Sequence, residues 1–208
     1  MRAHPLTLAL YWLLLGGLYI FGELAGEVYE REGFFFDGPI LAWLSARQSP
    51  ALTWLARAFS LLGSVYGLAP LGIGIALYLW RRSRRSLRFL IFGAGGAVAL
   101  DYLFKIIFSR ARPALYPQLS PVGGYSFPSG HAVASTAFFL SLYFIARRLW
   151  PRFSPLIGVL GLLLTLGVSL SRPYLQVHFP SDIIAGWALA AAWVLGLRFW
   201  YLHVPEPS

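Results

Sequence analysis

The chain has no cysteine and few charges. Of its 208 residues, 12% are charged, 58% are hydrophobic and 17% are aromatic. The missing cysteines exclude disulfides and thiolate metal sites, and they leave the redox compartment open. A soluble domain usually carries about 25% charged residues, so this chain has too few to cover a surface that faces water. The composition therefore indicates a single membrane domain over residues 1–208.

Acidic residues are fewer than basic residues. The chain has 8 Asp and Glu against 17 Lys and Arg, which gives a formal net charge of +9. Such an excess can indicate a nucleic-acid partner. Here the arginines gather in short loops between apolar runs, which is how membrane topology is encoded. We therefore expect no nucleic-acid partner and a chain embedded in a lipid bilayer.

Long apolar runs are the main positive feature. A helix needs about 20 mainly apolar residues to span a bilayer, and six segments meet or approach this length. They are residues 6–21, 54–80, 87–108, 129–144, 153–170 and 182–200. The first resembles the apolar part of a signal peptide, but we expect it to be retained as a span. Gly93, Gly95 and Gly96 are expected to allow close helix packing. The predicted fold is all-α, with six transmembrane helices.

The loops predict how these spans are oriented. Two short loops, around residues 81–88 and 147–152, are basic and belong in the cytoplasm. The connector over residues 23–50 carries five Asp or Glu against two Arg and belongs outside. In a six-span protein of the cell (inner) membrane, both termini are then cytoplasmic. Loops 109–128 and 171–181 face the extracytoplasmic side.

The acidic connector contains a helix signal. Asp37 precedes Gly38 and Pro39, which is typical of a helix start, and apolar residues follow through Leu44. We predict a short helix over residues 37–48 that lies at the outer interface, between spans one and two. The sequence leaves open whether this helix rests on the lipid surface or gates a substrate entrance.

Several cations stand in the outward loops, against the topological rule. Lys105, Arg110, Arg112 and Arg172 lie at or near the outer ends of predicted spans, and an anionic ligand is the simplest reason for them. Three short patterns occupy residues 105–113, 128–131 and 171–182. They read Lys105-x6-Arg112-Pro113, Pro128-Ser129-Gly130-His131 and Ser171-Arg172-x5-His178-x3-Asp182.

The basic residues of these patterns suit phosphate chemistry. Arg112 and Arg172 can hold phosphate oxygens in a bidentate manner, and Lys105 adds a compact charge. A Lys within a membrane segment is by default a candidate functional residue. Asp101, four residues earlier, is interpreted as a structural charge partner of Lys105, or as a polar packing residue, rather than as a catalytic acid.

The second pattern marks the start of the fourth span. A helix N-terminus presents free N–H groups and the positive end of its dipole, and both bind anions. Gly130 lets the backbone approach a ligand closely because it has no Cβ. His131 would stand beside a bound phosphate and can donate a proton to the leaving oxygen.

The third pattern pairs a histidine with a carboxylate. His178 and Asp182 are four residues apart, which places them on one helix face or within reach across a turn. An Asp that accepts from one imidazole nitrogen leaves the other unprotonated, which prepares a histidine nucleophile. Attack on phosphorus would give a phosphohistidine, which water then hydrolyses. Isolated histidines near membranes are more often interfacial, and we interpret His4 and His203 in that way.

At these residues the chain resembles the type-2 phosphatidic acid phosphatase family, which shares its core with bacterial acid phosphatases and vanadium haloperoxidases. The family signature reads K-x6-R-P, P-S-G-H and S-R-x5-H-x3-D, and all three motifs occur here in order. The resemblance implies a phosphatase that needs no metal and no other cofactor. The sequence agrees, since the few carboxylates near the motifs cannot form a cage for Mg²⁺.

The resemblance also implies a role for each motif residue. His178 would be the nucleophile, His131 the general acid and base, and Asp182 the residue that orients His178. The phosphate-binding residues would be Lys105, Arg112, Ser129, Gly130 and Arg172. The six spans point to the bacterial membrane branch, whose substrates include phosphatidate, phosphatidylglycerol phosphate and undecaprenyl diphosphate.

Two other functions stay open at this point. The same phosphohistidine could pass its group to a lipid acceptor, which would make the protein a phosphotransferase. An anion transporter could use the same cations without chemistry, although it would need polar or broken helices at the membrane midplane. The sequence does not rank the three lipids and does not give the oligomeric state.

Overall fold

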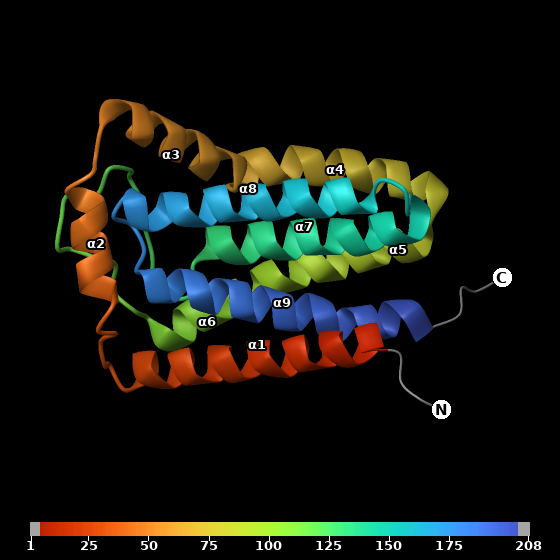
Figure 1. Ribbon diagram of the computed structural model, residues 1–208, viewed down its shortest axis with the longest axis horizontal. Helices are drawn as coiled ribbons and strands as arrows, with labels where there is room; N and C mark the ends of the chain where they lie inside the picture. The colour runs from red at the N-terminus through yellow and green to blue at the C-terminus, as the bar shows by residue number, and fades with distance from the viewer. Residues whose placement is uncertain (1–4, 204–208) are drawn as a thin grey trace.

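The computed structural model describes residues 5–203, and every regular element in that range is a helix. Most helices run along one axis, while α2 (Asp37–Ser45) crosses one end of the bundle (Figure 1). The others are α1 (Pro5–Tyr29), α3 (Pro50–Leu62), α4 (Val65–Arg82), α5 (Arg84–Leu90), the π-helical η1 (Ile91–Gly95), α6 (Gly96–Phe108), α7 (Gly130–Leu149), α8 (Ser154–Tyr174) and α9 (Pro180–His203). The all-α prediction is confirmed. His4 and the side chain of His203 lie outside what the structure describes.

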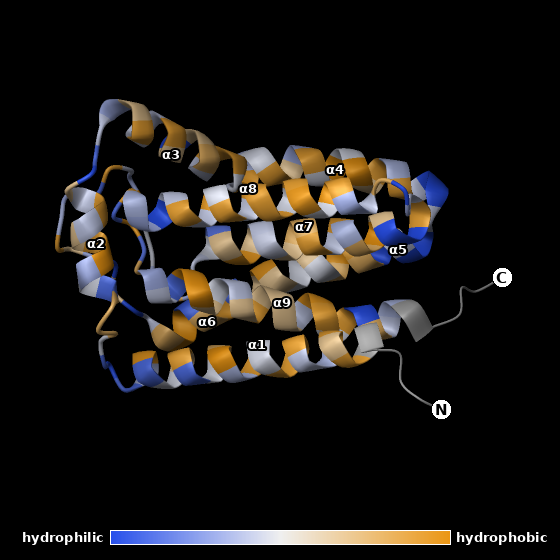
Figure 2. Ribbon diagram, in the orientation of Figure 1, coloured by the Kyte–Doolittle hydropathy of each residue, from blue (hydrophilic) through white to orange (hydrophobic). Residues whose placement is uncertain are grey.

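Five stretches of helix are long and apolar enough to cross a membrane. They are Leu8–Tyr29, Arg84–Phe108, Gly130–Leu149, Ser154–Tyr174 and Pro180–Tyr201. Large apolar side chains face outward, such as Trp12 and Tyr19, each 68% exposed. Soluble proteins rarely expose apolar surface on this scale. Figure 2 shows hydrophobic residues along the middle of the bundle and hydrophilic ones gathered near its ends.

The segment predicted as the second span is not one continuous helix. α3 and α4 together are apolar enough to cross a membrane, but they meet at a 41° bend, and the total is six only if this pair is one span. Ser64 starts α4 by accepting a hydrogen bond from the Tyr66 N–H at 3.2 Å. A Cβ on Gly63 would collide with Val168 of α8, so the glycine allows the bend to pack closely against α8. The apolar pattern continues through the break, which is why it predicted a single span.

α7 and α9 form the centre of the bundle. α7 packs against α8 and α9, and α1 lies along α9. In the largest core cluster, Phe89 of α5 stacks on Tyr201 of α9 with 4.3 Å between ring centroids, and Phe144 of α7 meets Phe89 edge-on. This packing joins α7 and α9 near their C-terminal ends. Near their starts, a Cβ on Gly186 of α9 would come within 2.9 Å of Ala132 of α7, so this glycine lets the two first turns, which carry residues of the predicted motifs, lie close together.

The three glycines around η1 have different surroundings. A Cβ on Gly93 would collide with the Ser141 hydroxyl, and one on Gly96 would come within 2.6 Å of the Trp193 ring. Close packing is therefore confirmed for these two. The prediction is wrong for Gly95, which has no neighbour within 4 Å of a Cβ position and lines a cavity. A π-helical turn often marks a functional region of a helix.

The predicted connector helix exists as α2, although it ends at Ser45 rather than at residue 48. Leu41 is fully buried, whereas Trp43 is 56% exposed. The side-chain amide of Gln176 donates to the Leu41 carbonyl at 3.1 Å. This contact fixes α2 onto the turn between α8 and α9.

Candidate active site

The predicted motifs come together at the end of the bundle that α2 crosses (Figure 1). The loop between α6 and α7 reaches the turn between α8 and α9, where the Leu119 N–H donates to the Leu175 carbonyl at 3.0 Å. The Ser129 N–H donates to the Asp182 carbonyl at 3.1 Å, which joins the starts of α7 and α9. Residues about fifty positions apart in the sequence thus share one site.

His178 and Asp182 form a buried pair. They are 2% and 0% exposed, and His178 Nδ1 lies 3.3 Å from Asp182 Oδ2. An ionised carboxylate only accepts hydrogen bonds, so Nδ1 carries the proton and Nε2 keeps its lone pair. The same Asp182 oxygen accepts from the Phe179 N–H at 2.9 Å and from the Ser126 hydroxyl. These contacts hold the imidazole in one tautomer and one orientation.

Arg112 stands on the other side of the His178 ring. Its Nη1 lies 3.1 Å from His178 Nε2 and donates to the Val177 carbonyl at 2.7 Å. Nε and Nη2 donate to the carbonyls of Gly124 and Gly123 at 3.1 and 2.9 Å. The guanidinium is thereby held beside the ring nitrogen that carries the lone pair.

The surroundings keep His178 uncharged. Burial lowers the pKa of His178 to about 4, and the positive charges of Arg112 and Arg172 act in the same direction. The hydrogen bond and the charge of Asp182 oppose this shift but do not cancel it. At neutral pH the imidazole is therefore neutral, which is the form that can act as a nucleophile.

We expect the ring of His178 to titrate near pH 4 instead of near 6.5. Between these values the unfolded chain binds a proton that the folded chain does not, so the free energy of unfolding should rise with pH across this window. Nitrogen NMR of protein labelled at its histidines measures the midpoint, and the His178→Gln variant assigns the signal. A midpoint near 6.5 would contradict the burial of the ring.

Ser60, in the last turn of α3, links His131 and Arg172. His131 Nε2 donates to the Ser60 carbonyl at 3.1 Å, and Arg172 donates to the Ser60 hydroxyl. A carbonyl only accepts, so Nε2 of His131 carries a proton and Nδ1 is the nitrogen that can take up or release another. Arg172 is 2% exposed, and its Nε has no hydrogen-bond partner among the described residues. A buried N–H without a partner is unfavourable, so this atom suits a ligand with acceptor oxygens.

Lys105 is paired with Asp101, as the sequence predicted. Its Nζ lies 2.7 Å from Asp101 Oδ1 and also donates to the Pro128 carbonyl. A Cβ on Gly130 would come within 2.8 Å of the Asp101 carboxylate. Glycine at position 130 therefore makes room for this ion pair, a structural reason that the motif did not reveal.

Ser129 offers its side chain rather than its backbone. Its N–H is bonded to the Asp182 carbonyl, while its buried Oγ has no partner within the described part of the chain. The first N–H groups of a helix lack intrahelical partners. The groups available for an anion at this point are thus the Ser129 hydroxyl and the first turn of α7, which begins at Gly130.

The sequence predicts an anionic ligand for Arg110, and the structure corrects this prediction: Arg110 binds the carboxylates of Asp37 and Asp182, at 3.0 and 2.6 Å. Two further residues of the site were not predicted. Ser60 and Ser126 carry no sequence signal, because serine is common in loops and at helix ends. Within residues 5–203, no three His, Asp or Glu side chains are grouped so that they could hold a metal ion.

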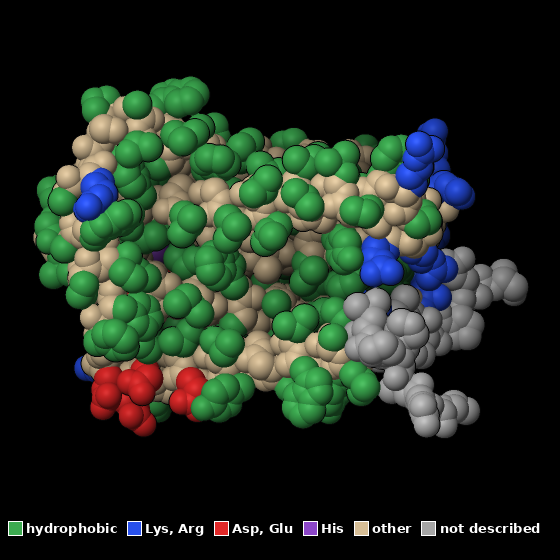
Figure 3. All heavy atoms as spheres, in the orientation of Figure 1, with side chains coloured by type: hydrophobic (Ala, Val, Ile, Leu, Met, Phe, Trp, Pro, Cys, Tyr) green, Lys and Arg blue, Asp and Glu red, His purple; other side chains and the backbone are tan. Residues whose placement is uncertain are grey.

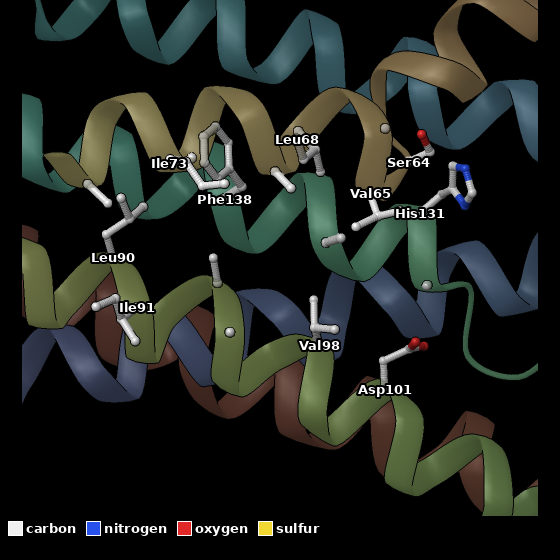
Figure 4. A pocket seen from close by; sticks show the side chains of 18 residues that line it. Ser64, Val65, Leu68, Ile73, Leu90, Ile91, Val98, Asp101, His131 and Phe138 are labelled. Carbon is white, nitrogen blue, oxygen red and sulfur yellow. The ribbon is translucent and has the colours of Figure 1, made fainter.

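A cavity of about 750 Å³ begins at His131 and runs between α4, the helix formed by α5 to α6, and α7. Figure 4 shows His131 and Asp101 at one end and Leu90 and Ile91 at the other. Apart from Ser64, Asp101 and His131, its lining residues are apolar or glycine. The cavity therefore joins a polar end to a long apolar channel.

The long apolar helices and the buried polar residues at one end define an integral membrane protein with an enclosed polar site. The family model of the PAP2 superfamily matches residues 86–205, more than half of the chain, so the chain belongs to this family. This finding confirms the resemblance inferred from the three motifs.

Relatives of known name match most of the chain. It is 27% identical to an undecaprenyl-diphosphatase of Sulfolobus acidocaldarius, over 88% of this chain and 87% of that one. It is 28% identical to phosphatidylglycerophosphatase B of Bacillus subtilis, over 89% and 88%. The fold matches the crystal structure of a transmembrane PAP2 type phosphatidylglycerolphosphate phosphatase from Bacillus subtilis. That match has a TM-score of 0.84 at 20% identity and covers 95% of this chain and 100% of that one.

Proposed function

We propose that the protein is a phosphatase that hydrolyses a phosphate monoester or diphosphate of a membrane lipid through a phosphohistidine. The observation that carries this proposal is the buried His178–Asp182 pair, with its lone pair facing Arg112. The apolar cavity that begins at His131 supports a lipid as the substrate. The names of the relatives add support, since both are lipid phosphatases.

The first step uses the ring nitrogen that faces the cations. Nε2 of His178 attacks phosphorus, and the bond between phosphorus and the lipid oxygen breaks. The Nδ1–H group stays bonded to Asp182, whose negative charge stabilises the phosphorylated ring. His131 donates a proton to the leaving oxygen. The product of this step is a phosphohistidine and a free lipid hydroxyl or lipid phosphate.

Charge on the transferred phosphoryl group is met by cations and N–H groups. Arg112, Arg172 and Lys105 bind its oxygens, with Ser129 and Gly130 contributing from the start of α7. In the second step, water attacks phosphorus, and the bond between phosphorus and Nε2 of His178 breaks. His131, which lost a proton in the first step, now acts as the general base and takes a proton from the water. Inorganic phosphate is released, and no metal takes part.

The site is proposed to face the extracytoplasmic side of the cell (inner) membrane. Figure 3 shows acidic side chains near the site end of the bundle and basic ones gathered at the opposite end. The basic loops α4–α5 and α7–α8 lie at that opposite end, where α1 begins and α9 ends (Figure 1). Because basic loops stay in the cytoplasm, we propose that both termini are cytoplasmic and that α2 lies at the outer interface.

Phosphate release from purified protein in detergent tests this function. Undecaprenyl diphosphate, phosphatidylglycerol phosphate and phosphatidate are compared without an added lipid acceptor. We expect release that persists in EDTA and is inhibited by vanadate, which imitates five-coordinate phosphorus bonded to His178. A strict requirement for Mg²⁺, or no release from any of the three lipids, would reject the proposal. Appearance of the phosphoryl group on an added lipid acceptor, without release of inorganic phosphate, would identify a phosphotransferase.

The cavity makes a separate prediction about the lipid tail. Gly95→Phe places a ring in open space within the cavity, so KM for a long-chain lipid phosphate should rise about 10-fold, or roughly 1.4 kcal/mol. A short-chain phosphate ester should be hydrolysed as before. Gly74→Phe is the matched control, because Gly74 also has open space at its Cβ position but does not line the cavity. Equal KM values for both variants would contradict a tail in this cavity.

The bend between α3 and α4 is an observation that favours the transporter hypothesis, since transporters carry broken helices at their binding sites. The two functions differ in what they need from His178. Transport uses only the cations, so movement of a phosphate anion into vesicles should survive His178→Ala. Hydrolysis should not.

A further inference from the structure

Arg110 is enclosed by two carboxylates and two aromatic rings. Its Nη1 donates to Asp182 Oδ1 at 2.6 Å, and its Nη2 donates to Asp37 Oδ2 at 3.0 Å. The guanidinium carbon lies 4.2 Å from the centre of the Phe179 ring and 5.5 Å from that of Phe34. The side chain is only 14% exposed. Arg110 is thus bonded to two protein carboxylates, whereas Arg112 donates to backbone carbonyls and Arg172 to the Ser60 hydroxyl.

The two oxygens of Asp182 have separate partners. Oδ1 accepts from Arg110, whereas Oδ2 accepts from Ser126, the Phe179 N–H and His178. A carboxylate that is bonded through one oxygen can still rotate about its last C–C bond. Hydrogen bonds to both oxygens fix its plane, and with it the direction in which the His178 ring points.

Asp37 holds Arg110 from α2 and also binds the start of α9. Its Oδ1 accepts from the Ser181 N–H at 2.9 Å, and its Oδ2 accepts from the Ser181 hydroxyl at 2.6 Å. Ser181 belongs to the first turn of α9, whose N–H groups need partners from outside the helix. Asp37 therefore caps α9 from a distant segment of the chain.

The charges in this network alternate in sign, from Asp37 through Arg110 to Asp182. Without Arg110, two buried carboxylates would face each other without a cation, which is strongly unfavourable for both charged forms. A protonated or rotated Asp182 would no longer hold the Nδ1–H group of His178.

We propose that Arg110 and Asp37 are positioning residues for His178, and that α2 is thereby part of the catalytic apparatus rather than a passive connector. Both act through Asp182 and do not touch the phosphoryl group. This inference rests on the proposed hydrolysis, in which His178 is the nucleophile.

Three variants test the pair by steady-state kinetics on the best lipid of the panel. Arg110→Gln should lower kcat about 10- to 100-fold, the range typical for outer partners of a functional histidine, with KM unchanged. Arg110→Lys keeps the charge but cannot reach both carboxylates as a fork does, so it should recover part of the loss. Asp37→Asn should lower kcat in the same direction. The matched controls Arg47→Gln and Glu32→Gln change exposed residues of the same connector and should keep wild-type kcat.

A double-mutant cycle separates positioning from a general effect on folding. If Arg110 acts through Asp182, then Arg110→Gln should add little to the loss already caused by Asp182→Asn. A full additional loss in that background would show a general structural role and overturn the inference. So would a rise in KM with kcat unchanged, because it would make Arg110 a phosphate ligand. Wild-type kcat in Arg110→Gln would overturn it directly.

The ring tautomer of His178 gives a readout that needs no turnover. Nitrogen NMR should show the Nδ1–H form in the wild type and a mixture of both tautomers in Arg110→Gln. The same single tautomer in both proteins would overturn the positioning role. If the wild type releases no phosphate from any lipid, the proposed function fails, whereas the tautomer result still decides whether Arg110 positions His178.

Discussion

The His178→Ala protein is expected to release phosphate at less than about one ten-thousandth of the wild-type rate. Removal of a covalent nucleophile costs on the order of 10⁴- to 10⁶-fold in kcat, even when the rest of the site stays in place. The cations remain in this variant, so KM for the lipid should change little. Phosphate release on the preferred lipid measures the loss. Labelled phosphate should also fail to appear on the protein as an acid-labile adduct.

The control for this variant is His4→Ala, which removes a histidine that the sequence predicts to be interfacial. It should keep wild-type activity. Thermal denaturation of both variants shows whether the fold is preserved, since burying a small side chain at position 178 leaves space in the site. Substantial hydrolysis by a folded His178→Ala protein would place the nucleophile on another residue.

The ends and breaks of the helices show what hydropathy alone can predict. The first span was predicted to end near residue 21, but α1 continues to Tyr29. Charged side chains such as Glu23 and Glu27 end an apolar run without ending a helix, because they are good helix formers. The bend at Gly63 was missed for the opposite reason. Gly63 ends α3 and Ser64 caps α4, but the apolar run continues through both residues and hid this break. The contact with Val168 that Gly63 permits lies more than a hundred residues away and has no local signal.

Some residues of the candidate site could be predicted from the sequence, and others could not. The motif residues could be found because their chemistry and spacing are local, and the structure brings His178, Asp182 and Arg112 into contact. The two partners of Arg110 could not be found, because Asp37 and Asp182 lie 73 and 72 positions away and meet it only in the folded chain. The sequence did show that Arg110 stands where the topology rule disfavours a cation. It could not show that the anions that bind Arg110 are carboxylates of the protein itself.

The Asp182→Asn protein is expected to lose about 10³- to 10⁴-fold in kcat, with KM nearly unchanged. The reason is that the two oxygens of this carboxylate have different partners, Arg110 at Oδ1 and His178 at Oδ2. Arg110 donates to Oδ1 at 2.6 Å, and a bond from a charged donor is stronger than the one that the neutral Phe179 N–H gives to Oδ2, so the carbonyl oxygen of an Asn is drawn to the Arg110 side. Its NH₂ group then faces His178 and cannot accept from Nδ1–H. The ring is left to adopt the Nε2–H tautomer, which has no lone pair facing phosphorus.

The negative charge of Asp182 and its orientation of the His178 ring have different measurable consequences. If the lost negative charge were the main effect, activity in Asp182→Asn would fall while the His178 ring kept its Nδ1–H tautomer. If orientation is the main effect, nitrogen NMR should show the Nε2–H form together with the loss of kcat. A folded Asp182→Asn protein within about 10-fold of wild-type kcat would contradict both, because the nucleophile would then need no carboxylate to hold it. In that case the contacts of Ser126 and the Phe179 N–H with residue 182 would serve only the fold.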